Sequence, residues 1–413
     1  MTATVTSSDV ENQGLSTDHS KATADGAHTH GVPTVAGSRA DRIASFDPTV
    51  ITVPNGREEE WRFSPVAKLA PLFETDLAAD GVTIAVDAAP EVTVETVDRT
   101  DARLGKSGVP GDRTAVAAWN AFDKATVLTV PRNAVASKET SVLFTGASDA
   151  PTASHLLIEA GESSQALFII DHTGDARLNQ TVEIIAGDNA NITVVSVQDW
   201  DEKTVHAASH RVRLGRDAHV KHVVVTFGGD VVRITPDAEF TGAGGDLEMV
   251  GLYFADTGQH QEHRLFVDHA VPNCKSRVTY KGAVQGQDAH VVWIGDVLIR
   301  ANASGTDTYE MNRNLILTDG GRADSVPNLE IETGEIEGAG HASTTGRFDD
   351  EQLFYLMARG ISEGEARRLV VRGFFAELIQ EIGVPAVEER LINSIDRELE
   401  KSMSVIQGTG PAA

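Results

Sequence analysis

The chain has 413 residues, too many for one ordinary compact core, so two or three structural units are expected. Aspartate and glutamate outnumber lysine and arginine by 61 to 35, which gives a net charge of −26. This charge argues against a nucleic-acid groove and against binding to an anionic membrane, because both need basic patches. The single cysteine, Cys274, excludes an intramolecular disulfide and a zinc site built from several thiolates.

The N-terminal part of the sequence gives no targeting signal. It lacks a basic start followed by an apolar stretch, and no apolar run in the chain approaches the roughly 20 residues of a membrane span. The cytoplasm is therefore the expected compartment. Residues 1–40 contain almost no large apolar side chains, so they cannot bury enough surface to offset the entropy of ordering, and we expect a disordered tail.

Residues 41–125 have a mixed pattern that predicts short helices. The segment 57–65 is followed by apolar residues at Leu69, Leu72 and Phe73, and residues 119–122 suggest another helical turn.

From 126 to 345 the pattern is one of short strands. Runs rich in Val, Ile, Leu and Thr are separated by Gly, Asp and Asn. A degenerate repeat consists of a glycine, two or three polar residues, a small residue and then a strand, with copies at Gly187, Gly215 and Gly286 and looser copies at Gly161, Gly244 and Gly320. In chain order the first four of these glycines, from Gly161 to Gly244, are 26 to 29 residues apart. This spacing favours a solenoid, here a parallel β-helix. An antiparallel sandwich or jelly roll stays open on periodicity alone.

The strand pattern ends in a run of small residues, 338–346, which we interpret as a loop carrying His341. From residue 346 to 413 the pattern is helical. Gly360 predicts a helix end, and Ser362 with Glu365 has the spacing of a capping box that starts the next helix. An apolar stripe predicts the buried face of that helix: Ala366, Leu369, Val370, Phe374, Leu378 and Ile382.

A last helix is predicted between Gly383, which ends the preceding helix, and the C-terminal residues. Pro385 suits its first turn, and its apolar stripe consists of Val387, Leu391, Ile395 and Leu399. Such stripes usually pack on the protein's own body, although a helical pair at the end of a solenoid could equally dock a partner.

The chain contains no recognisable complete active site. It has no phosphate-binding Gly-x-x-x-x-Gly-Lys loop, no Gly-x-Ser-x-Gly elbow, no His-Glu-x-x-His pair and no Cys-x-x-Cys. Two places still stand out. His263, His269 and Cys274 lie close in sequence, and His341 lies at the junction of the two patterns. Taken alone, each fits a structural role better than a chemical one, since cysteine is a small buried apolar residue in most folds.

These stretches carry a family resemblance when they are taken together. The pattern begins with His269-x-x-Pro-x-Cys274-x-Ser and Tyr280-Lys-Gly, and it continues with Asn314-Leu-Ile-Leu and Pro327-x-Leu-Glu-Ile. It ends with His341-x-x-Thr-x-Gly, Phe354-Tyr-Leu and Arg359-Gly-Ile. An Arg57-x-x-Glu-Trp-Arg segment matches near the N-terminus, whereas residues 65–150 carry no match. In these motifs the chain resembles the SufD subunits of the SUF iron–sulfur cluster assembly system, within the SufB/SufD family.

The resemblance implies a right-handed parallel β-helix with helical ends and no catalytic activity of its own. It implies a heterodimer with SufB, leaves open a homodimer when SufB is absent, and places the SufC ATPase on the C-terminal helices. The matching tail positions are Arg359, Gly360, Ile361, Ala366 and Leu369. It further implies an iron–sulfur cluster held transiently with SufB, with His341 facing a SufB cysteine, with Cys274 a weaker candidate ligand and with no nucleotide bound by this chain.

One thiolate cannot supply a cluster's ligand set, which is mainly cysteine with histidine as a substitute, so a partner must complete any site. A SufB-type subunit remains an alternative, but it would carry a cysteine at Ala323 and a glutamate at Ala342. Many SufD relatives have a cysteine where this chain has Ala339. Two further alternatives stay open. One is a carbohydrate-active β-helix enzyme, which the missing export signal and the acidic charge disfavour, and the other is an interaction solenoid with no role in iron chemistry.

Overall fold

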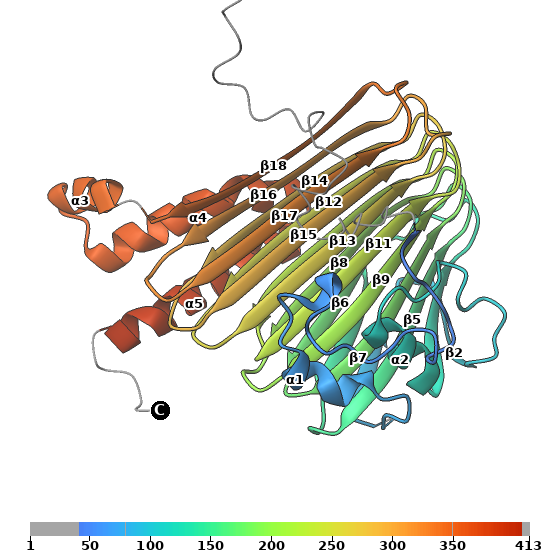
Figure 1. Cartoon of the computed structure of the whole chain (residues 1–413), viewed down its shortest axis with the longest axis horizontal. Coiled ribbons are helices and arrows are strands. Elements are labelled where there is room, and N and C mark those ends of the chain that lie inside the picture. The colour runs from blue at the N-terminus through green and yellow to red at the C-terminus, as the bar shows by residue number, and fades with distance from the viewer. Residues whose placement is uncertain (1–40, 79, 349, 407–413) are drawn as a thin grey trace, which may run out of the picture. The chain divides into compact units, whose positions relative to one another are not determined.

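A computed structural model describes residues 41–78, 80–348 and 350–406, and the tail expected at 1–40 lies outside them. The part from Arg42 onward is one unit built on a parallel β-solenoid (Figure 1). From β3 onward, successive strands alternate between two nine-stranded sheets, so each coil contributes one strand to each sheet. Pairing is parallel from β3 onward in one sheet and from β4 onward in the other. The predicted β-helix is therefore confirmed, and the antiparallel sandwich is wrong.

The strands of the solenoid body are ten residues long from β5 onward. The even-numbered sheet, which also includes β1, contains β1 (Val82–Asp87), β4 (Thr140–Gly146), β6 (Gln165–Gly174), β8 (Asn191–Trp200), β10 (His219–Gly228), β12 (Asp246–Ala255), β14 (Lys275–Val284), β16 (Asp307–Ile316) and β18 (Gly338–Arg347). The odd-numbered sheet, which also includes β2, contains β2 (Thr93–Asp98), β3 (Lys124–Val130), β5 (Pro151–Ala160), β7 (Arg177–Ala186), β9 (Val205–Leu214), β11 (Val231–Phe240), β13 (His260–His269), β15 (His290–Ile299) and β17 (Arg322–Ile331).

The sequence repeat corresponds to a turn that leads into one strand of a coil. The copies from Gly161 to Gly244 precede the even-numbered strands β6 to β12, and those at Gly286 and Gly320 precede β15 and β17. In its full copies the third residue, Asn189, Asp217 or Asp288, has φ between 52° and 59°. Asparagine and aspartate tolerate this left-handed conformation better than other residues with a Cβ. The alanine that follows is buried in the interior. The repeat therefore records one turn per coil.

The first end of the solenoid is formed by two strands that the sequence did not indicate, and Ala89 and Val92 between them are buried over its interior. β1 pairs antiparallel with β4, and β2 pairs antiparallel with β3. The helical elements predicted nearby are present as η3 (Glu59–Trp61), α1 (Val66–Leu69), η4 (Ala70–Phe73) and α2 (Arg113–Ala121). They cover the odd-numbered sheet (Figure 1). Arg233 of β11 holds them there, with Nη1 2.6 Å from Asp112 Oδ2 and its guanidinium over the ring of Trp61.

Three helices follow the solenoid: α3 (Asp350–Ala358), α4 (Glu363–Ile382) and α5 (Pro385–Ile406). Their boundaries follow the predicted signals. The Ser362 hydroxyl accepts a hydrogen bond from the Glu365 amide, and Gly383 ends α4 in the left-handed conformation. The α5 stripe from Val387 to Leu399 is buried as predicted, together with the α4 face, against apolar side chains on the outside of the even-numbered sheet.

The predicted stripe of α4 is partly wrong. Ala366, Leu378 and Ile382 are buried, but Leu369 is exposed and Val370 and Phe374 are only half-buried. Val371, Phe375 and Ile379 complete the buried face instead. Apolar residues surround more than one face of α4, so the pattern alone cannot choose the face. The packing against α5 and the sheet makes that choice.

Candidate functional site at the open end of the solenoid

The last coil of the solenoid has no strand stacked upon it. β17 pairs with β15 and β18 pairs with β16, and no described strand pairs with the other edge of either (Figure 1). Every residue of β17 and β18 is half-buried or exposed, whereas nine of the ten residues of β15 are buried. The last coil therefore presents free backbone groups and interior-facing side chains to solvent, a state that solenoids normally cover with a cap.

His341 lies on strand β18, so our interpretation of 338–346 as a loop is wrong. The run of glycine, alanine, serine and threonine lacks the apolar alternation of a half-buried strand, because nothing packs beyond it. It is nevertheless held in register by parallel pairing with β16, in which His341 stands opposite Glu310. The His341 side chain is 44% exposed at the end of the solenoid.

Glu310 lies directly beneath this histidine and is a site residue that the sequence reasoning missed. Its side chain is 1% exposed, and Oε1 lies 3.8 Å from Nδ1 of His341, too far for a hydrogen bond. Neither carboxyl oxygen has a hydrogen-bond partner among the described residues. Burial, with a smaller effect of Asp296, raises the pKa of Glu310 to about 8. The sequence did contain a signal: the alternate positions Glu310, Asn312 and Asn314, which face the interior in β16, are all polar.

A polar network lies in the interior below the same end. Asn314 Nδ2 donates to the Ser325 hydroxyl at 2.8 Å, and Ser325 donates to Asn312 Oδ1 at 2.6 Å. The Tyr253 hydroxyl donates to Asn314 Oδ1 at 2.6 Å. Asn314 belongs to one of the motifs singled out in the sequence, and the network explains it as part of the packing between β16 and β17.

The structure does not bring Cys274 to His341. Cys274 occupies the turn before β14, two strands inward from β18, and its side chain is fully buried in the apolar interior. Its thiol contacts the carbonyl oxygens of Pro272 and Gly242 at 3.5 and 3.6 Å, and burial raises its pKa. His263 and His269 are buried as well, and desolvation lowers the pKa of each to about 3. Both lie on β13.

The described residues contain no group of three or more His, Cys, Asp or Glu side chains that could hold a metal ion. His341 and Glu310 are therefore at most part of a ligand set. Any cluster or metal held at this end needs ligands beyond those that the described residues provide.

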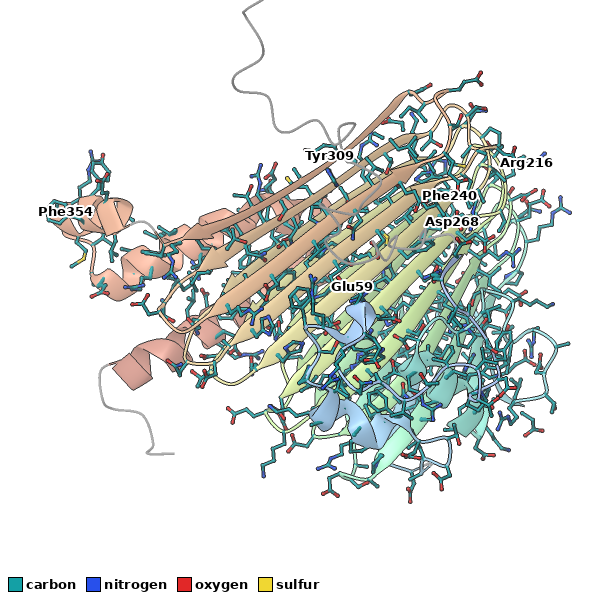
Figure 2. The ribbon with its side chains drawn as sticks, viewed as in Figure 1. Glu59, Arg216, Phe240, Asp268, Tyr309 and Phe354 are labelled. Atoms are coloured by element: carbon teal, nitrogen blue, oxygen red, sulfur yellow. The ribbon has the colours of Figure 1, made fainter. Side chains whose placement is uncertain are left out.

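The tail positions named by the resemblance are not equally accessible. Ala366 is buried against the helical pair and Leu369 is 43% exposed. Arg359 stacks on the Tyr355 ring at 4.5 Å, and Gly360 takes a positive φ of 87° after the end of α3, next to the half-buried Ile361. Among the described residues of the C-terminal helices, the most exposed large apolar side chains are on α3 itself. We call Phe354, Tyr355 and Met357 the α3 apolar patch; Phe354 is 74% exposed and points away from the solenoid (Figure 2).

Comparison with known proteins decides the family. The family model described as the SufBD core domain of SUF system iron–sulfur cluster assembly matches residues 143–374. The chain belongs to the SufBD family. A SufBD family iron–sulfur cluster assembly protein of Mycobacterium tuberculosis is 52% identical over 92% of this chain and 98% of its own length.

More distant members of the SufBD family match a smaller share of the chain. The SufD protein of Bacillus subtilis is 27% identical over 74% of this chain and 71% of its own. A second SufBD family protein of the same M. tuberculosis strain is 27% identical over 51% of this chain and 25% of its own. Within the described residues of this SufBD chain, every helix is too short or too polar to cross a bilayer.

Proposed function

We propose that this chain is a SufD-type scaffold subunit without catalytic activity of its own. It pairs with a SufB-type subunit through the open end of the solenoid, and a SufC-type ATPase docks on its C-terminal helices. The cluster is cargo that forms at the shared interface in the cytoplasm and is passed on, and this chain binds no nucleotide. Membership of the SufBD family supports a role in iron–sulfur cluster assembly. The geometry of the last coil supports the proposal that a second subunit covers this end and supplies the other ligands.

The observation that carries the proposal is the contrast between the two ends of the solenoid. At the first end Ala89 and Val92, between β1 and β2, are buried over the interior, whereas every residue of β17 and β18 is half-buried or exposed. Tyr309 on β16 (Figure 2) and Ile331 on β17 add exposed apolar side chains near this end. Edge strands attract a second chain, so an edge that is kept open in a folded protein indicates a partner that covers it.

His341 lies in the coil that the partner would cover. Its half-exposed imidazole is free of the apolar interior, and neutral imidazole is a competent ligand for iron. The only thiol of the chain is buried away from it, so thiolates have to come from the partner. The proposed subunit contributes one imidazole and a docking surface.

Two residues favour the SufD type over the SufB type. Ala323 and Ala342 stand where the SufB type is expected to have a cysteine and a glutamate. Both lie on the open strands β17 and β18, so the two subunit types would differ in ligands at this very interface.

The variant His341→Ala tests the site. We expect it to fold and to pair with SufB and SufC as the parent chain does, because the side chain is 44% exposed at the end of the solenoid. Cluster yield, measured as iron and acid-labile sulfide per complex after anaerobic assembly, should fall at least tenfold. The matched control is His219→Ala, which removes an exposed histidine from β10. Normal cluster yield in the His341 variant would remove the histidine from the mechanism.

The variant Phe354→Ser tests the docking of the ATPase. Removing the most exposed ring of the α3 apolar patch should weaken SufC binding at least tenfold, because exposed aromatic anchors dominate many interfaces. Isothermal titration of SufC into the purified chain measures the affinity. Ile84→Ser on β1, where the side chain is 39% exposed and lies outside the C-terminal helices, is the control. Deleting everything after residue 346 is a blunter test, because it also uncovers the apolar sheet face beneath α4 and α5.

A further inference from the structure

Glu310 is buried at a cost that the fold does not explain. A carboxyl group taken out of water needs a hydrogen bond or a counter-charge, and nearly all buried polar groups have one. The two oxygens of Glu310 have no hydrogen-bond partner in the described part of the chain. The Nδ1 atom of His341 lies 3.8 Å from Oε1.

The interior is shaped to receive this carboxyl group. A Cβ atom on Gly295 of β15 would lie 2.3 Å from Oε2 of Glu310 and 2.4 Å from the ring of Trp293. The carboxyl group thus occupies a space that exists because residue 295 has no side chain. The Trp293 indole N–H next to it is also buried without a hydrogen-bond partner among the described residues. The neighbouring residues therefore leave room for the carboxyl group but give it no hydrogen bond.

The distance between the two side chains suits a shared cation. Imidazole nitrogen and carboxylate oxygen bind first-row divalent metals at about 2.0–2.2 Å. Two such donors around one ion are separated by at most about 4.2 Å, so Nδ1 and Oε1, 3.8 Å apart, can both reach one ion between them. His341 faces solvent and Glu310 lies one coil below, so the ion would enter from the open end.

We propose that Glu310 and His341 form a two-ligand half-site for a divalent transition metal such as ferrous iron. A second chain that covers the open end supplies the remaining ligands, because the described residues hold no larger group of metal-binding side chains. This inference rests on the proposed function and extends it. The subunit then delivers a nitrogen and an oxygen ligand, which hold ferrous iron as a single ion before sulfide arrives.

The experiment uses the full chain in its complex with SufB and SufC, prepared without iron and kept anaerobic. Ferrous iron is titrated, and Co²⁺ is used in parallel because its visible absorption reports the ligand set. Glu310→Gln keeps the shape of the side chain but cannot form the carboxylate that would bind the ion, and it should weaken binding of both ions at least tenfold and change the Co²⁺ spectrum. Glu337→Gln, an exposed carboxylate just before β18, should change neither.

The outcomes separate this inference from the proposed function. If His341→Ala abolishes iron binding and cluster yield while Glu310→Gln preserves both affinities and the spectrum, the half-site is wrong and the function stands. If His341→Ala gives normal cluster yield, the proposed role of the histidine fails whatever Glu310 does. Thermal unfolding of Glu310→Gln controls for folding, and the midpoint should not fall, because a buried carboxyl is replaced by a neutral amide.

A second measurement is independent of any variant. Anomalous diffraction from the Co²⁺-loaded parent complex should show a peak between Nδ1 of His341 and Oε1 of Glu310. Absence of a peak there at saturating Co²⁺ would overturn the inference.

Discussion

Cys274 shows how burial decides the chemistry of a single residue. The thiol lies in the apolar interior, and burial raises its pKa, so the reactive thiolate is scarce at neutral pH. We expect the folded chain to resist a thiol reagent such as 5,5′-dithiobis(2-nitrobenzoate) at pH 8 for hours, and to react fully with it in denaturant. Cys274→Ala should leave cluster yield unchanged. Rapid modification of the native protein, or a lower cluster yield in the alanine variant, would contradict this prediction and make Cys274 a candidate ligand again.

At this scale the resemblance located His341, but single-residue reasoning could not find Glu310. His341 matches a motif, whereas Glu310 is one acidic residue among 61. Its importance depends on facing the interior under the last coil, opposite Gly295. Strand register determines that Glu310 lies under the last coil and opposite Gly295, and the register became known only with the fold.

The recurring turn of the solenoid gives a test at the level of elements. Asn189 has a φ of 58°, and its side chain makes an exposed hydrogen bond to the Ser163 hydroxyl. Asn189→Val should cost about 1–2 kcal/mol in the free energy of unfolding, because a β-branched side chain strains the left-handed conformation. Asn189→Gly should be close to neutral, since glycine adopts this conformation freely. Chemical denaturation measures both, and equal losses would show that the turn conformation is not the cause.

Elements in repeats were easier to predict than elements at boundaries. The repeat gave the solenoid because each coil carries the same turn residues, and the caps Ser362 and Gly383 marked α4 because capping depends on local hydrogen bonds. β18 was missed because a last strand has lost the packing that normally selects apolar residues. The buried face of α4 was partly missed because its neighbours select it.

The whole molecule combines a first end whose interior is covered by residues between β1 and β2, a covered pair of sheet faces and an open last coil. Helical elements protect the odd-numbered sheet from one side, and α4 and α5 protect the even-numbered sheet from the other (Figure 1). The stability of the solenoid therefore resides away from the proposed interface. Side chains on the last coil that would bind the cluster can be substituted without disturbing the core, as His341→Ala is expected to show.

The solenoid also encloses a series of histidines, and this predicts sensitivity to acid. Desolvation lowers the pKa of His172 and His222 to about 4 and that of His263 and His269 to about 3. The unfolded chain protonates these groups near pH 6.5, so below that pH it binds more protons than the folded chain. Stability is therefore complete above pH 6.5 and is lost as the pH falls toward 4. Glu310 changes stability with pH in the opposite direction, because its raised pKa lets the folded state hold a proton that the unfolded state has lost. Its contribution to the pH dependence therefore offsets that of one of these four histidines.

Each buried histidine should contribute a slope of up to about 1.4 kcal/mol per pH unit between pH 6.5 and 4. His222→Gln keeps a polar side chain beside His210 but cannot gain a proton, so the pH dependence of the free energy of unfolding should flatten by up to that amount. Urea denaturation at half-unit steps of pH measures the slope. His219→Gln, at an exposed position on the same strand, should leave it unchanged. A parent chain equally stable at pH 6.5 and pH 4.5 would contradict the idea that the interior keeps its histidines neutral.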